Sequence, residues 1–140
     1  MPARTAISIP GTKPIDEKIT INLGYVDLGQ IDLLVAEGFY GNRTDLIRTA
    51  IRNQLASHSD AVKQAVARKT LVLGLQHFSA ADLRAVKAAR QTLQIRVLGL
   101  ATIADDVTPE LALATIGSIE VLGALRASPE VKAALAARHR

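Results

Sequence analysis

Residues 17–23, with the sequence EKITINL, alternate polar and apolar side chains, as a half-buried β-strand does. The apolar face of this strand carries Ile19, Ile21 and Leu23. Its polar face carries Lys18, Thr20 and Asn22. No second alternating run flanks the segment, so its backbone donors and acceptors need a partner from elsewhere. The simplest partner is the same strand from a second copy of the chain, antiparallel across a two-fold axis.

Two helices are predicted directly after this strand. Apolar residues recur at helical spacing over about residues 25–37, and Gly38 then ends the first helix. Asn42 is a favourable N-cap for the second helix, and Asp45 can reach back to complete a capping box. In a dimer, the apolar strand faces would cover a shared four-helix core and leave a two-stranded ribbon facing outwards.

The outer face of such a ribbon suits the major groove of B-DNA. Lys18 can donate to guanine, and Asn22 can bridge the edge of adenine. Thr20 can donate, accept or offer its methyl group. The alternative interpretation of these side chains is an ordinary solvated sheet surface.

Over about residues 17–56, KITINL is followed by a helix and then by GFYGNRTDLIRTAI. This segment resembles the ribbon-helix-helix fold of CopG-, Arc- and MetJ-type DNA-binding regulators. The resemblance implies an obligate homodimer whose ribbon enters the major groove, usually in repressors or antitoxins. It places Lys18, Thr20 and Asn22 at the base-reading positions. It places the backbone amides of Asn42, Arg43 and Thr44 at a phosphate clamp, and a helix N-terminus does favour anions. The Gly24-Tyr25 pair departs from the family, which often has Pro and an acid there, and weakens the first helix start.

The arginines of the second helix have two interpretations. Arg43 is the best placed to contact a phosphate, whereas Arg48 and Arg52 are better explained as ion-pair partners for acids of the first helix. Residues 1–60 hold six Lys or Arg against seven Asp or Glu, and the remaining eighty hold eleven against six. This distribution works against tight DNA binding by the N-terminal half alone.

An internal repeat organises the rest of the chain. LVLGL (71–75), RVLGL (96–100) and EVLGAL (120–125) recur at a spacing of 24 to 25 residues, each followed by a Ser or Thr cap and an acidic first helical turn. Continuous apolar runs predict strands buried on both faces and paired in parallel through helical crossovers. The recurring glycines Gly74, Gly99 and Gly123 indicate a bulge or a close backbone approach, here interpreted as helix against strand.

The predicted fold is therefore α+β, in four parts. They are a flexible arm (1–15), a ribbon-helix-helix domain (16–56), a linker helix (57–68) and a module of three β–α repeats (69–140). Open strand edges in this module predict that it promotes oligomerisation.

Several site classes find no support in the sequence. Cysteine is absent, and His58, His77 and His139 do not have the spacing of metal ligands. The pair Asp105-Asp106 is better explained as a polar loop than as a cation site. No phosphate-binding loop or nucleophile motif is present, so we expect no enzyme, cofactor or metal. No apolar run approaches eighteen residues, which favours a cytoplasmic protein without a membrane segment.

The sequence thus predicts a DNA-binding transcriptional regulator, a repressor, whose partners are double-stranded DNA and a second copy of the chain. The C-terminal module would extend the homodimer to a tetramer or higher. One alternative is an antitoxin-type DNA-binding protein whose C-terminal module binds a partner protein, and another is a DNA-binding scaffold or partition protein. Antitoxin tails are usually disordered until bound, so the ordered repeats favour the regulator.

Overall fold

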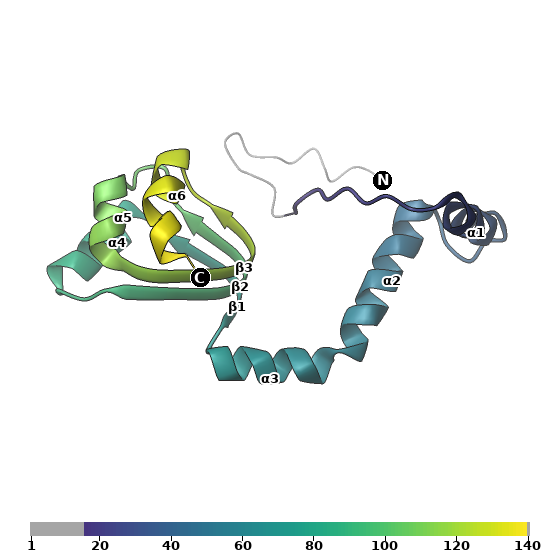
Figure 1. The fold of residues 1–140 in the computed structure, drawn as a ribbon, viewed down its shortest axis with the longest axis horizontal. Helices are drawn as coiled ribbons and strands as arrows, with labels where there is room; N and C mark the ends of the chain where they lie inside the picture. The colour runs from purple at the N-terminus through teal and green to yellow at the C-terminus, as the bar shows by residue number, and fades with distance from the viewer. Residues whose placement is uncertain (1–15, 140) are drawn as a thin grey trace.

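The computed structural model describes residues 16–139, and the predicted arm (1–15) lies outside this range. An extended segment (16–24) precedes all helices and strands. Figure 1 shows the chain passing through three helices before it enters a sheet with helices packed on it. The elements are α1 (Tyr25–Ala36), α2 (Arg43–Ser57), α3 (Ser59–Lys69), β1 (Val72–Phe78), α4 (Ala80–Ala88), β2 (Leu93–Ile103), α5 (Pro109–Thr115), β3 (Ile116–Arg126), α6 (Pro129–Leu135) and a 3-10 turn, η2 (Ala136–Arg138).

The ends of α1 and α2 follow the local signals of the sequence. After α1, Gly38 has a φ of +87°, a left-handed conformation that glycine adopts without steric cost. At the start of α2, the Asn42 side chain accepts the backbone N–H of Asp45 at 2.8 Å, which confirms the predicted N-cap. The Asp45 carboxylate accepts the N–H of Gly41 at 2.9 Å, one residue earlier than the predicted capping box requires.

The sheet consists of three parallel strands, as the repeats predict, and their order is β1-β2-β3. Its register aligns the repeats, because Gly74 pairs with Gly99 and Gly99 pairs with Gly123. The crossover helices α4 and α5 lie with α6 on the same face of the sheet (Figure 1). The strands β2 and β3 are much longer than the apolar runs from which they were predicted.

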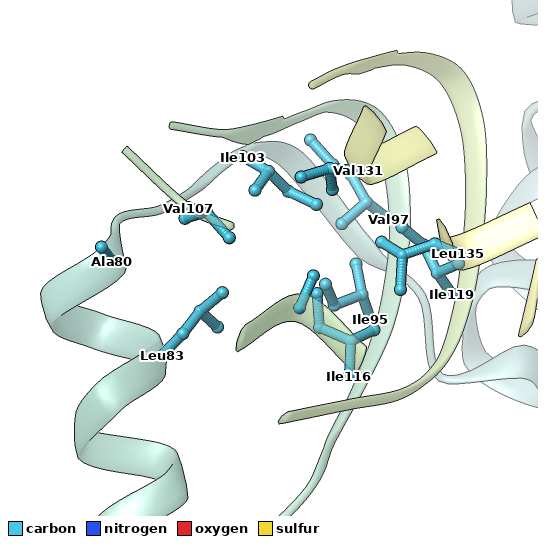
Figure 2. Packing of buried hydrophobic residues seen from close by; sticks show 12 residues of the cluster. Ala80, Leu83, Ile95, Val97, Ile103, Val107, Ile116, Ile119, Val131 and Leu135 are labelled. Carbon is cyan, nitrogen blue, oxygen red and sulfur yellow. The ribbon is translucent and has the colours of Figure 1, made fainter. Parts of the chain in front are cut away.

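The hydrophobic core lies between these helices and the covered face of the sheet. Figure 2 shows Leu83 of α4 and Val131 of α6 pointing toward side chains of β2 and β3. The residues that form the centre of this core are all fully or almost fully buried: Ala80, Leu83, Ile95, Val97, Ala101, Ile103, Val107, Ala112, Ile116, Ile119, Val131 and Leu135. Among described residues, every core member thus belongs to the repeat module.

The helices of the module are closed by their caps. Ser79 and Asp82 form a reciprocal capping box at α4, and the backbone N–H of Ser79 lowers the pKa of the Asp82 carboxyl. At α5 and α6, the hydroxyls of Thr108 and Ser128 accept a backbone N–H, and Pro occupies the first helical position. The cap pattern read from the repeat sequences is confirmed at all three helices.

Burial on both faces of the sheet, expected from the continuous apolar runs, is wrong for the single chain. No described helix covers the second face, and Leu73 and Leu75 of β1 are 62% and 67% exposed there. Leu122 of β3 is 47% exposed. A continuous apolar run indicates that both faces of a strand are buried in the functional state. It does not indicate whether the same chain or another chain packs on each face.

The close backbone approach at the glycines is between neighbouring strands. The predicted approach of a helix to a strand is wrong. All three glycines have positive φ, +114° at Gly74, +143° at Gly99 and +121° at Gly123. A Cβ added at Gly99 would lie 2.1 Å from the Gly74 carbonyl oxygen, and one at Gly123 would lie 2.1 Å from that of Gly99. We call this row the glycine ladder. It requires residues without a side chain at its second and third positions.

Candidate nucleic-acid interface

The segment 16–24 is extended but has no strand partner among residues 16–139. The apolar side chains predicted to face a core are open, with Ile19 71% and Ile21 58% exposed. Neither α1 nor α2 contains a buried residue. The alternating pattern therefore predicts a surface that the single chain leaves uncovered, and a stable fold of this half needs apolar cover from outside it.

The opposite face of the segment carries Lys18, Thr20 and Asn22. All three are exposed, and none makes a side-chain hydrogen bond or ion pair within the described part of the chain. Their donors and acceptors are available to a ligand. The structure thus places the three predicted base-reading residues next to one another along one extended stretch.

The second predicted contact is the N-terminus of α2. The first helical amides, at Arg43 and Thr44, have no backbone acceptor among the described residues, as is usual for a first turn. Their positive potential is offset by the Asp45 carboxylate, which lies in the same turn. The site can accept a phosphate by hydrogen bonding, with a modest electrostatic contribution.

The side chain of Arg43 does not point to a free phosphate position. Its Nε and one terminal nitrogen donate to the two oxygens of Asp32 on α1, each at 2.8 Å. These hydrogen bonds lower the pKa of Asp32 and raise that of Arg43, so the pair stays charged around neutral pH. Both side chains are exposed, so the pair adds little to stability.

This pair corrects the assignment of the arginines. Arg48 and Arg52, expected to pair with acids of the first helix, make no ion pair within residues 16–139, and Arg43 makes one instead. The sequence did not reveal Asp32 as a partner, because the turn between the helices decides which side chains meet.

With this geometry described, comparison with known proteins decides the family. The sequence profile of the Ribbon-Helix-Helix transcriptional regulator family matches residues 14–132, most of the chain. The chain belongs to this family. Ribbon-helix-helix proteins bind DNA, typically as dimers, and are typically not enzymes. No curated protein and no solved structure matches the chain.

The profile match also covers the repeat module, which the resemblance noted from residues 17–56 did not. The family match therefore spans the ribbon-helix-helix segment and most of the repeats. Within the described range, no cluster of three His, Asp or Glu side chains could hold a metal ion. No helix there is both long and apolar enough to cross a membrane.

Proposed function

We propose that this ribbon-helix-helix protein is a sequence-specific repressor of transcription in the cytoplasm. Residues 17–23 of two copies pair as an antiparallel ribbon, and this ribbon reads the major groove. Lys18, Thr20 and Asn22 contact base edges, and the amides that open α2 hold the flanking phosphates.

The unpaired extended segment carries this proposal. Its exposed apolar residues and its open backbone groups are both satisfied by one event, pairing with an identical segment. The polar side chains then stand in two copies on the far side of the ribbon. The family supports DNA as their ligand.

An antitoxin that captures a partner with a disordered tail is less well supported. Its tail would fold only on binding, whereas the C-terminal module here has a buried core of its own. Limited proteolysis of the full chain separates the two. A resistant core beginning near α3 supports the regulator, and rapid loss of everything after α2 supports the antitoxin. A scaffold or partition protein would instead sediment as a broad series of polymers.

Removing a base contact should relax sequence preference. We expect Lys18→Ala and Asn22→Ala each to cost about 1–3 kcal/mol of discrimination at one base position, with the dimer intact. Lys63→Ala on α3 is the matched control, since Lys63 is exposed and lies outside the ribbon. Binding to a randomised DNA pool measures all three. Unchanged sequence preference in both ribbon variants would refute base reading by this face.

Asp32→Asn should change how DNA binding depends on salt. The substitution removes the carboxylate that holds Arg43, so the guanidinium becomes free to approach a phosphate near the start of α2. We expect the slope of log affinity against log salt to steepen by about one for each Arg43 that gains a phosphate. Titrations at several salt concentrations test this, and Asp27→Asn on the same helix is the control. An unchanged slope would show that Arg43 does not reach the backbone.

A further inference from the structure

The uncovered face of the C-terminal sheet is built from two parallel rows of apolar side chains. The register places Leu73 beside Leu98 and Leu98 beside Leu122. The second row lies on the other side of the glycine ladder. We call these six residues the leucine face: Leu73, Leu75, Leu98, Leu100, Leu122 and Ala124.

The leucine face carries no charge in either row, and its charged residues stand only at its two ends. At one end are Arg96 and Glu120, and Glu120 accepts the Lys69 ammonium at 3.0 Å. At the other end the register places His77, the uncharged Thr102 and Arg126 in one row, and Arg126 has no ion-pair partner among the described residues. An apolar centre with a charged rim is typical of a protein interface. A DNA-binding face would carry basic residues at its centre instead.

We propose that the leucine face is the surface through which two copies of this chain join their C-terminal modules, face to face with strands antiparallel. Parallel sheets are normally covered on both faces, and the single chain supplies only one cover. This inference rests on the proposed function for the availability of the second copy. A ribbon dimer holds two modules in one assembly, which raises the effective concentration of one leucine face at the other.

The repeats make the face complementary to itself. We place the two-fold axis along the glycine ladder, so each strand faces the same strand of the partner in the opposite direction. A residue that precedes the ladder glycine by some number of positions then lies opposite the partner residue that follows the same glycine by that number. Leu98 then lies opposite the partner's Leu100. Arg126 lies opposite the partner's Glu120, and this contact occurs twice.

A hollow at one end of the face fits the same arrangement. It has a volume of ≈ 490 Å³, and Leu75, Leu100 and Arg126 are among the residues that line it. The antiparallel pairing brings the partner's Glu120 end over this hollow. A second copy therefore adds an apolar cover and the Glu120 carboxylate beside Arg126, in a hollow that Asp105 also lines.

Cross-linking through a single cysteine tests the pairing in the full chain, which has no cysteine of its own. Leu98 lies on the central strand, so Leu98→Cys of the two copies should be joined by a bis-maleimide with a reach of about 10 Å, the usual distance between packed sheets. Lys87→Cys on α4, exposed on the opposite side of the sheet, is the control. Leu122→Cys on β3 replaces the first variant should that one not fold.

We expect the Leu98→Cys thiol to react more slowly than the control thiol with the bis-maleimide and with a monofunctional maleimide, and the variant to run as a covalent dimer on a denaturing gel after prolonged reaction with the bis-maleimide. The Lys87→Cys variant should react quickly and stay a single chain. A Leu98→Cys thiol that reacts as fast as the control overturns the proposal, because the face is then open. Attachment of the bis-maleimide at one end without cross-linking also overturns it, because no second Leu98→Cys thiol is then within reach.

The ribbon is tested separately from this face. A cross-linked Leu98→Cys variant that selects no DNA sequence would remove the proposed function and leave the leucine face as an interface. A Leu98→Cys variant that selects a DNA sequence but does not cross-link would support the proposed function and remove the leucine face as an interface.

Discussion

Gly99→Ala should strongly destabilise the C-terminal module. Its Cβ would lie 2.1 Å from the carbonyl oxygen of Gly74, which is backbone and cannot swing aside. The φ of +143° adds conformational strain for any residue with a side chain. We expect a loss of at least about 3 kcal/mol, a large fraction of the stability of a small domain. Thermal unfolding followed by circular dichroism measures it.

Gly74→Ala is the matched control for this prediction. Gly74 belongs to the same ladder and has a φ of +114°, but nothing lies within 4 Å of the position of an added Cβ. It should therefore lose only about 1–3 kcal/mol, the cost of the strain. Equal losses in the two ladder variants would show that strand contact contributes nothing.

Gly29→Ala should have the opposite effect. Gly29 lies within α1, and nothing is within 4 Å of the position of an added Cβ, so the substitution should stabilise the helix by about 0.5–1 kcal/mol.

Ile21→Asp should unfold the N-terminal helices and abolish the ribbon dimer together. In the proposed dimer the substitution places an unpaired carboxylate in the shared core, at a cost of several kcal/mol, on the order of the whole stability of such a domain. The helices cannot persist alone, because α1 and α2 contain no buried residue in the single chain. Helical circular dichroism and specific DNA binding should both fall.

Thr20→Asp is the control, because Thr20 is next to Ile21 but faces the other way. It should keep the dimer and lose DNA affinity by repelling phosphates. Association through the leucine face could hide the loss of the ribbon dimer, so sedimentation is measured with Leu98→Glu in both variants. A helical dimer of the Ile21→Asp, Leu98→Glu double variant would contradict the shared core.

The elements predicted best from the sequence are those set by local spacing. Asn42 caps α2 because an N-cap needs only its own side chain and an amide three residues on. The three parallel strands follow from the repeat, since equivalent segments separated by helices pair in the same direction. Such features depend on residues that are close together in the sequence, so a single sequence is enough to predict them.

Features that depend on how elements meet were not accessible in this way. Arg43 pairs with Asp32 because of the geometry of the turn between two helices, which residue spacing does not encode. Gly99 was identified as a point of close approach, but the approaching group is a neighbouring strand. The exposure of Leu73 and Leu75 could not be foreseen, because an apolar pattern does not identify the surface that covers it. The base-reading roles of Lys18, Thr20 and Asn22 remain predictions.

The pairing of residues 17–23 between two chains is tested most directly by isotope-filtered NMR on a mixture of labelled and unlabelled full-length protein. Such spectra record only proximities between protons of different chains. The account predicts contacts between backbone protons of residues 18–22 in one chain and those of the same residues in the other, in the antiparallel order. Contacts of this segment with its own chain alone, or with the partner's C-terminal module, would contradict it.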